Sequence, residues 1–416
     1  MMQVEIICTG DEILSGKIIN SNFSYMSRKL EEVGLSVVWG TTVGDDRKEL
    51  LDAFVLASKR SDAVIVNGGL GPTVDDLSQE IAAEASGMEL ELREDWLGKM
   101  ESFFTMRGRT MTENNKKQAM LPRTSELIDN PVGTACGFAI NIGKSRFFFT
   151  PGVPRELFRM LENEIIPRLL TLSGEKVITK LKTFHSYGIG ESRADSILNE
   201  SLKLSPDNIV KLGFQAHYPQ LETKLYIKAS SLEQIEKNLK PVENDIRDKL
   251  NNFIFAEDKD TLEGVIIRKL AKNNETIAIA ELKTNGGTAA RLSSEDFNGE
   301  ILKCGIFANN IENIYEQFDI QEKNTLDLKG SDIIASTIRK LFSASYGLSV
   351  IIKNTLDNEA EAYISLSDSE NIISRIGYFV GDEQRIRLGA VEMALDCLRR
   401  YLQDLPFNEK SDFEKL

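Results

Sequence analysis

The chain has 416 residues, 41% apolar and 27% charged, an ordinary balance for globular protein that leaves room for two or three domains. Its net charge of −14 argues against a nucleic-acid partner, because phosphate backbones attract clustered Lys and Arg. With four widely spaced cysteines, two histidines and no bilayer-length apolar stretch, we expect a reduced cytoplasmic protein without structural zinc that contacts no membrane.

The first 170 residues alternate apolar strands with amphipathic helices. Strands are expected at 4–8, 35–42, 63–66 and 146–149. The run 63–66 is apolar throughout, which is typical of a central parallel strand covered on both faces. Between the strands, apolar residues such as Phe23, Met26 and Leu30 recur at helical spacing. This repetition predicts an α/β fold with a doubly wound, mostly parallel sheet over residues 1–170.

Two further segments follow the first domain. Residues 171–256 are expected to form a small α+β domain, and residues 257–416 a C-terminal α/β domain. Their expected elements are strands at 180–184, 221–229 and 276–280 and helices at 191–202, 232–250, from about 261, and at 384–402. The polar tail from Asn408 to Leu416 is expected to fray.

Four loops after predicted strands of the first domain carry its acidic residues and glycines. They are Gly10-Asp11-Glu12, Gly44-Asp45-Asp46, Asn67 to Asp76, and Thr150 to Glu156. Because the carboxyl ends of parallel strands meet at one edge of a sheet, where open α/β sheets bind ligands, we expect the loops to cluster there.

The run from Gly68 to Thr73, Gly-Gly-Leu-Gly-Pro-Thr, is the sharpest feature. Glycines permit φ > 0 and close approach of the backbone, which turns N–H groups toward phosphate oxygens. A helix is expected to begin at Thr73 or Asp75, which adds the positive end of its dipole. Asp75 and Asp76 offer hard oxygen ligands for Mg²⁺ or a similar cation, which can bridge diphosphate oxygens and activate water.

Each feature alone has a commoner structural explanation. A glycine-rich turn is usually just a turn, an Asp before a helix is usually a cap, and Asp45-Asp46 is usually solvated. The convergence of four loops on one sheet edge favours the functional interpretation for Asp75, Asp76 and the glycines. The triplet Asn115-Lys116-Lys117 keeps two equal interpretations, a solvated charge cluster or point charges that reach phosphate.

Five strings of the first domain, in order, resemble the N-terminal domain of the CinA family. They are Thr9 to Glu12, Gly44 to Asp46, Asn67 to Asp76, Asn130 to Ala135, and Thr150 to Glu156. That domain has the fold of the molybdopterin-binding MogA/MoaB group, and the resemblance implies a metal-dependent ADP-ribose pyrophosphatase that releases AMP and ribose 5-phosphate. It also implies a homodimer and a KH-type domain at 171–256, with Gly188 to Ser192 as a weak marker. The charge argues against RNA there.

On this resemblance, we expect catalysis to depend on Asp75, Asp76 and Asp11. The metal is expected to be a divalent cation (Mg²⁺, Mn²⁺ or Co²⁺), with K⁺ as a further candidate, bound by Asp75, Asp76 and Asp45. The expected substrate contacts are Gly10, Asn67, Gly68, Gly69, Gly71, Thr73, Lys116, Gly152 and Glu156.

The C-terminal segment resembles the family's nicotinamide mononucleotide deamidase in outline only. Active members read Glu-Ser-Cys-Thr-Gly-Gly, and an Arg follows at a fixed distance from the Glu. Glu281 and Arg291 keep that spacing, but Leu282 stands at the position of the nucleophilic serine. The family's Tyr and Lys positions hold Phe307 and about Glu312, and its Thr-Gly-Ile-Ala-Gly-Pro string is absent. We expect the fold to persist without deamidase activity.

Two functions of the first domain therefore stay open. One is a hydrolase that cleaves ADP-ribose or a related nucleotide such as CoA or FAD. The other is a binding module that senses a nucleotide or a pterin without cleaving it. A structural or interaction role for the C-terminal domain is a third, weaker hypothesis.

Overall fold

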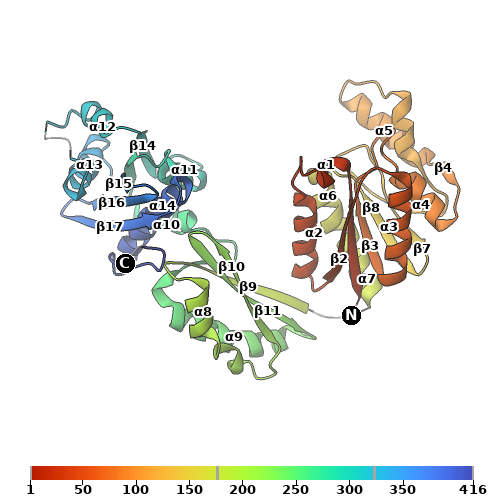
Figure 1. The fold of residues 1–416 in the computed structure, drawn as a ribbon, viewed down its shortest axis with the longest axis horizontal. Coiled ribbons are helices and arrows are strands. Elements are labelled where there is room, and N and C mark those ends of the chain that lie inside the picture. Colours follow the sequence, from red (N-terminus) through yellow and green to blue (C-terminus); the bar gives the residue numbers. More distant parts are fainter. Residues whose placement is uncertain (1, 175–177, 322–324, 415–416) are drawn as a thin grey trace. The chain divides into compact units, whose positions relative to one another are not determined.

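The computed structural model describes residues 2–174, 178–321 and 325–414 (Figure 1). The chain divides into two compact units, Met1–Lys180 with Lys228–Ser231, and Leu181–Ile227 with Leu232–Leu416. The second unit holds two separate sheets. The division into domains at residues 170 and 256 stays a prediction.

A six-stranded sheet with the order β2-β1-β3-β8-β7-β6 forms the centre of the first unit. Its strands are β1 (Gln3–Thr9), β2 (Ser36–Val43), β3 (Ala63–Asn67), β6 (Glu126–Ile128), β7 (Gly137–Ile142) and β8 (Ser145–Thr150). The pairs β1–β2, β1–β3 and β3–β8 are parallel, whereas β6 and β7 are antiparallel additions. A separate antiparallel pair joins β4 (Leu90–Leu92) and β5 (Met120–Pro122). The predicted mostly parallel α/β fold is confirmed.

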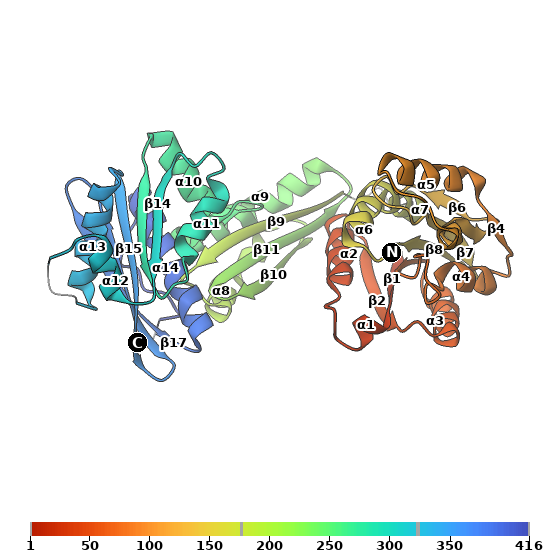
Figure 2. The same ribbon diagram turned by 90° about the horizontal axis from the view of Figure 1, so that it is seen from above.

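Helices cover both faces of this sheet (Figure 2). One face packs against α2 (Ser21–Glu32), α6 (Pro154–Met160), the π-helical turn η2 (Leu161–Ile165) and α7 (Ile166–Ser173). The other packs against α3 (Arg47–Arg60), α4 (Ser78–Ser86) and α5 (Glu94–Met106). Ala63 and Ile65 of β3 join the first core and Val64 and Val66 join the second, which is why this strand is apolar at every one of these positions.

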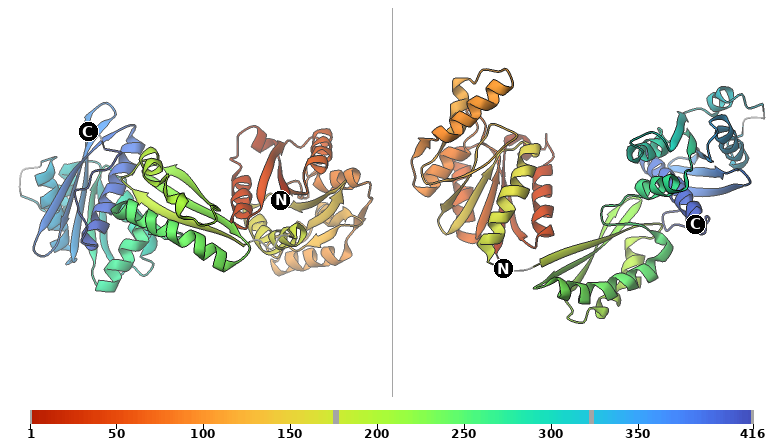
Figure 3. Two further views of the ribbon diagram at one scale, coloured as in Figure 1. Left: turned by 90° about the horizontal axis from the view of Figure 1, so that it is seen from below. Right: turned by 180° about the vertical axis from the view of Figure 1, so that it is seen from behind.

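The smaller sheet of the second unit has the order β10-β11-β9-β12, with α8 and α9 on one of its faces (Figure 3). Its elements are β9 (Ile178–Tyr187), α8 (Glu191–Leu198), the 3₁₀ turns η3 (Ser201–Leu204) and η4 (Asn251–Phe253), β10 (Val210–His217), β11 (Gln220–Ala229), α9 (Leu232–Leu250) and β12 (Ile254–Glu257). The sequence predicted β9, β11 and both helices, but it missed the edge strands β10 and β12.

The C-terminal sheet has the order β14-β13-β15-β16-β17 and is also covered on both faces. Its strands are β13 (Ile277–Leu282), β14 (Leu302–Ala308), β15 (Tyr346–Leu356), β16 (Glu359–Ser367) and β17 (Ile372–Val380). The helices are α10 (Leu262–Asn273), α11 (Gly287–Glu295) and α14 (Glu383–Leu402) on one face, and α12 (Ile311–Gln317) and α13 (Leu328–Leu341) on the other.

The chain end after α14 differs from the expectation that it frays. The Asp412 amide donates to the Gly188 carbonyl oxygen at 3.0 Å, and the Asp412 carboxylate accepts from the Gly190 amide and Arg193, each at 2.9 Å. Glu414 pairs with the buried Arg375. Charge pairing therefore holds residues 408–414 in place despite their polarity, while 415 and 416 lie outside the described residues.

A buried carboxylate fixes the strand that precedes the first loop. Glu5 on β1 is fully buried and accepts hydrogen bonds from Arg60 Nε at 3.0 Å, Ser61 Oγ at 2.9 Å and Thr41 Oγ1 at 2.8 Å. Burial alone would raise the pKa of Glu5, but these donors outweigh it and hold the pKa below the ordinary value of 4.5. The network ties β1 to β2 and to the end of α3.

We predict that Arg60→Met lowers the stability of the first unit by about 2 kcal/mol or more, because a buried carboxylate loses its charged donors. The matched control is Arg47→Met on the same helix, which removes half-exposed ion pairs to Glu80 and Glu84 and costs under about 1 kcal/mol. Thermal melting of the full chain compares them.

The contribution of the Glu5–Arg60 interaction to stability depends on pH. Since the pKa of Glu5 is lowered in the folded protein, its stabilising contribution is complete above pH 4.5 and is lost as the pH falls through the folded value. The melting difference between Arg60→Met and the parent should therefore shrink in acid below pH 4.5. Equal melting of the two Arg variants at neutral pH would contradict the assignment.

Candidate active site

Loops from all four parallel strands meet at the carboxyl edge of the first sheet. They enclose a cleft of about 460 Å³. Its lining residues are Thr9, Gly10, Glu12, Asp45, Gly68, Gly69, Leu70, Gly71, Pro72, Thr73, Asp75, Asp76, Gln118, Thr134, Ala135, Pro151, Gly152, Val153 and Glu156. The clustering expected of the four loops is therefore what the structure shows, and the string from Asn130 to Ala135 adds a fifth wall through its last two residues.

Ser78, the first residue of α4, holds the glycine-rich loop in place through two hydrogen bonds. Gly68 and Gly69 have φ of 115° and 68°. The Ser78 hydroxyl donates to the Gly68 carbonyl oxygen at 2.9 Å, and the Ser78 amide donates to the Gly69 carbonyl oxygen at 3.1 Å. A Cβ on Gly69 would lie 2.4 Å from Ser78 Oγ. Gly71 is different, because it has no positive φ and a Cβ there would meet only the end of the Asp76 side chain.

Asp76 closes the loop onto itself. Its Oδ2 accepts from the Thr73 amide at 2.8 Å and from the Thr73 hydroxyl at 2.5 Å. The following helix α4 begins at Ser78, so the expectation of a helix start at Thr73 or Asp75 is wrong by several residues. The residues from Thr73 to Asp76 form a turn that Asp76 caps. Asp75 lines the cleft, and its carboxylate has no hydrogen bond to another described residue.

Asp11 and Asp45 face each other across the first two loops. The Asp11 amide donates to Asp45 Oδ2 at 3.2 Å, and the Asp45 amide donates to Asp11 Oδ1 at 3.3 Å. Burial raises the pKa of Asp45, and the charges of Asp11, Glu12 and Asp75 raise it further, against the hydrogen bond from the Asp11 backbone. Asp45 and Glu12 line the cleft, whereas Asp11 supports Asp45 from behind.

Asn67 is buried and lies outside the cleft lining, in contrast to the substrate contact expected of it. Its Nδ2 donates to Thr150 Oγ1 at 3.1 Å and to the Pro151 carbonyl oxygen at 2.7 Å. Its Oδ1 accepts from Asn22 Nδ2, which also donates to the Gly152 carbonyl oxygen at 2.7 Å. Asn67 thus joins the ends of β3 and β8 and sets the position of Gly152, which does line the cleft.

Glu156 reaches the cleft from the first turn of α6. Asn130 Nδ2 donates to Glu156 Oε2 at 2.7 Å and to the Ala135 carbonyl oxygen at 3.0 Å. A Cβ on Gly133 would lie 2.2 Å from the Glu156 carboxylate, so the absence of a side chain there makes room for it. Asn130 and Gly133 are positioning residues that sequence reasoning noted only as part of the family string.

The structure does not bring Lys116 into the cleft. Its ammonium pairs with Glu113 at 2.9 Å on the exposed side of the 3₁₀ helix η1 (Glu113–Ala119). Lys117 instead donates to the Thr73 carbonyl oxygen at 2.8 Å, on the outer side of the glycine-rich loop. Neither lysine lines the cleft, whose described wall contains five carboxylates and no Lys or Arg.

The end of β13 and the loop after it place Leu282 and Thr284 where neither side chain is open to a ligand. Leu282 is buried in the core against α12 and α13, and the Thr284 hydroxyl donates to the buried Glu281 carboxylate at 2.5 Å. Glu281 also accepts from the Thr288 and Ala289 amides and so caps α11. A hollow of about 220 Å³ beside this loop has a lining without hydroxyl or thiol groups. Its lining residues are Lys283, Asn285, Asn309, Ile352, Asn354, Glu383, Ile386 and Arg387.

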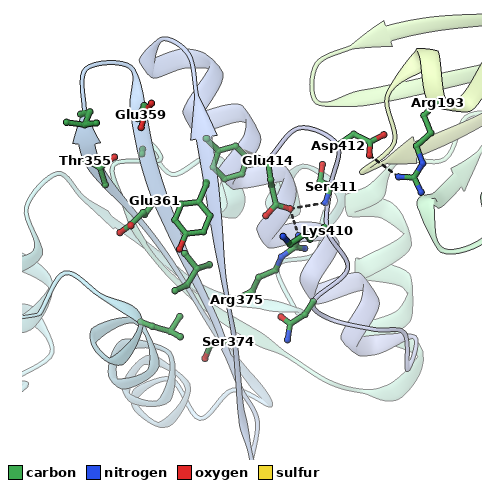
Figure 4. Close-up of a pocket in the computed structure, with 17 residues that line it drawn as sticks. Arg193, Thr355, Glu359, Glu361, Ser374, Arg375, Lys410, Ser411, Asp412 and Glu414 are labelled. Atoms are coloured by element: carbon green, nitrogen blue, oxygen red, sulfur yellow. Dashed lines mark hydrogen bonds and ion pairs between the residues drawn. The ribbon is translucent and has the colours of Figure 1, made fainter. Parts of the chain in front are cut away.

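A hollow of about 1000 Å³ lies between β15–β17 and residues 408–414 (Figure 4). Its arginines already have carboxylate partners, since Arg193 pairs with Asp412 and Arg375 with Glu414. None of these residues is predicted from the sequence to form a site.

These features define a doubly wound α/β domain with an acidic, glycine-lined cleft, followed by a second unit with two further sheets. Residues 5–171 match the family described as "Probable molybdopterin binding domain", and residues 181–256 match the "Damage-inducible protein CinA KH domain". The chain belongs to the CinA family. No helix in the described part of the chain has the length and apolar character of a membrane span.

Relatives align with the chain over nearly their full length. A "Putative competence-damage inducible protein" of Clostridium novyi (strain NT) is 33% identical, over 96% of this chain and 99% of its own. A "CinA-like protein" of Geotalea uraniireducens (strain Rf4) is 30% identical, over 99% and 100%. Among solved structures, CinA of Thermoplasma acidophilum is 34% identical over 40% of this chain and 97% of its own, with a TM-score of 0.37.

We predict that Gly69→Ala and Gly71→Ala separate two roles of glycine in the loop. Gly69→Ala should cost about 1 kcal/mol or more of stability, because it combines positive φ with a clash at Ser78. Gly71→Ala should cost less, because Gly71 has no positive φ and its cost comes from displacing the Asp76 carboxylate from Thr73. Thermal melting of the full-length variants measures both, and equal shifts would argue against the described loop conformation.

Proposed function

We propose that the first domain hydrolyses the diphosphate of ADP-ribose or a related adenine dinucleotide to AMP and a sugar phosphate. The observation that carries this proposal is the cleft lining, in which a glycine-rich backbone faces carboxylates. These are Glu12, Asp45, Asp75, Asp76 and Glu156. A diphosphate enters such a site only when cations offset the repulsion between like charges.

The donor set fits a divalent cation that binds together with its substrate. No cluster of three or more His, Cys, Asp or Glu suited to an ion occurs within the described ranges. Mg²⁺, however, is usually bound by one or two carboxylates plus substrate phosphates rather than by an all-protein cage. Asp45 and Asp75 are the first candidates, with Asp76 beside them. Burial raises the pKa of Asp45, and the charges of Asp11, Glu12 and Asp75 raise it further, a repulsion that a cation would offset. Mn²⁺, Co²⁺ and K⁺ stay candidates.

Each wall of the cleft has a part in the proposed reaction. A bound divalent cation would supply Lewis-acid activation of a phosphoryl oxygen and of water. The backbone of residues 69–71 offers N–H groups to phosphate oxygens, whereas the Gly68 and Thr73 amides already donate within the protein, and the Asp76 cap keeps that loop in shape. Glu156, oriented by Asn130, is our candidate to accept a proton from the attacking water.

Release of AMP from ADP-ribose tests the proposal directly. The full-length protein should form AMP and ribose 5-phosphate with Mg²⁺, Mn²⁺ or Co²⁺ and should stop when the metal is chelated. CoA and FAD, assayed in parallel, rank the substrates. If ADP-ribose binds tightly but no AMP forms with any of these metal ions, the hydrolase proposal is wrong and the second candidate is favoured.

The second candidate is a module that binds a pterin or nucleotide without cleaving it. It draws support from the match of residues 5–171 to a "Probable molybdopterin binding domain" and from the lack of a three-ligand metal cluster in the described chain. A titration that shows binding of a pterin in the presence of chelator, with no turnover of diphosphates, would favour it.

We expect the protein to act as a cytoplasmic homodimer with neither nucleic-acid nor membrane partners. The net charge of −14 supports the exclusion of nucleic acid, and all four cysteines are free. Sedimentation of the full chain measures the dimer.

We predict that Asp75→Asn and Asp76→Asn each reduce kcat/KM for ADP-ribose by about 100-fold, because each removes a charged contact to the reacting diphosphate or its cation. Asp46→Asn is the matched control. Asp46 caps α3 by accepting from the Lys48 and Glu49 amides and lies outside the cleft lining, and Asn preserves that cap. Full activity of both Asp75 and Asp76 variants in excess metal would remove these residues from the site.

We also predict that the intact protein releases no ammonia from nicotinamide mononucleotide. Nucleophilic catalysis needs a hydroxyl or thiol beside a base, and the hollow next to Lys283 offers neither group. Leu282→Ser should not restore activity, since that side chain points into the core. Ammonia release that persists in repurified protein and disappears on truncation at residue 256 would overturn this expectation.

A further inference from the structure

Gln118 brings a buried carboxamide to the wall of the cleft. It is the penultimate residue of η1 and is 3% exposed, yet it lines the cleft beside the glycine-rich loop. Neither its residue type nor its place in the chain connects it with the family strings, and the sequence analysis did not select it. The fold places it there by running η1 past the backbone of Leu70.

The neighbouring backbone fixes which end of this carboxamide faces the ligand. Gln118 Nε2 donates to the Leu70 carbonyl oxygen at 3.3 Å. A carbonyl oxygen only accepts, so the reversed amide would set two oxygens against each other. Oε1 is therefore the free end, and among the described residues it has no hydrogen-bond partner.

A second buried polar group without a hydrogen-bond partner lines the same cleft. Thr9 Oγ1 at the end of β1 has no partner within the described chain, and Thr9 is 6% exposed. Buried polar atoms are nearly always paired in folded proteins, because an unpaired one loses its hydration without compensation. Because both residues line the same cleft, a bound ligand is one source of the hydrogen bonds that these two atoms lack.

The chemistry of Gln118 Oε1 restricts that ligand. The oxygen only accepts, so it needs an N–H or O–H group, which an ionised phosphate or carboxylate does not have. In ADP-ribose the adenosine half carries both kinds of donor, the exocyclic amino group of the base and the ribose hydroxyls. A rigid base edge also suits an acceptor whose position is fixed by the backbone.

We infer that Gln118 is a specificity-determining residue whose Oε1 accepts a hydrogen bond from the adenosine moiety of the substrate. This assignment rests on the proposed function for its substrate class. The donor is either the base amino group or the ribose 2′-hydroxyl, and both place the adenosine beside Leu70 and the start of the glycine-rich loop.

Calorimetric titrations with AMP, IMP and 2′-deoxy-AMP test the assignment. IMP replaces the amino group by a carbonyl and 2′-deoxy-AMP lacks one hydroxyl, so the two arms distinguish the donors. We expect one analogue to bind at least about 10-fold more weakly than AMP, because it leaves a buried acceptor unpaired. These ligands contain no diphosphate, so the result does not depend on whether the protein cleaves ADP-ribose.

Gln118→Met removes the acceptor while keeping the length of the side chain, and it should bind all three ligands with equal affinity. Gln79→Met is the matched control, because Gln79 is equally buried but lies outside the cleft lining, and it should keep the parental ratios. The ratio between ligands cancels any general loosening caused by loss of the Leu70 hydrogen bond. Melting curves of both variants confirm that they fold.

Three results would overturn the inference: no measurable binding of AMP to the parent, equal affinity of the parent for all three ligands, or unchanged ligand ratios in Gln118→Met. If AMP binds with the expected ratios but ADP-ribose yields no AMP, the hydrolase proposal fails and the role of Gln118 stands.

Discussion

The carboxamide of Asn67 joins the two strands at the centre of the first sheet. It bonds to Thr150 and Pro151 at the end of β8 and accepts from Asn22 of α2, which in turn holds Gly152. Parallel strands share their hydrogen-bond ladder only up to their last residue, and beyond it each loop must find its own partners. Asn67 provides them at the point where the chain leaves both strands. The glycine-rich loop and the start of α6 can therefore diverge and leave a cleft between them.

The second constraint is electrostatic. Five carboxylates converge on a cleft whose described wall has no basic side chain, and Lys117, which bonds to the Thr73 carbonyl oxygen and pairs with Glu80, lies outside that wall. Such a site stores repulsion that solvent and bound cations must offset. The surrounding structure tolerates this repulsion because three of the carboxylates have hydrogen-bond donors of their own. Asp76 satisfies backbone and hydroxyl groups of its own turn, Glu156 is held by Asn130, and Asp45 exchanges hydrogen bonds with Asp11.

Much of the fold was predictable, because apolar periodicity follows burial. β3 is apolar wherever both faces are covered. In the helices at 47–60 and 383–402, apolar residues recur at helical spacing. The edge strand β10 was missed because only one of its eight residues is buried, and β12 was missed because it has only four residues. The start of α4 was misplaced because Asp76 caps a turn with Thr73, and local sequence does not separate this from a helix cap.

The site was predictable as a set of loops but not residue by residue. Strand–loop alternation placed the acidic groups at one edge, yet it could not tell that Asn67 points inward or that Lys117, not its neighbour, touches the loop. Gln118 had no local signal, since its role depends on a carbonyl group 48 positions away in the chain. Contacts of this kind arise from topology, which a single sequence does not display.

Residues at the carboxyl end of the described chain contact residues that lie much earlier in the sequence. Asp412 bonds to Gly188 and Gly190, in the string that gave the KH-type domain its weak marker, and Glu414 neutralises Arg375 inside the C-terminal sheet. A recombinant fusion at the carboxyl terminus begins two residues beyond this buried ion pair. A purification tag there needs a spacer that keeps it clear of this ion pair.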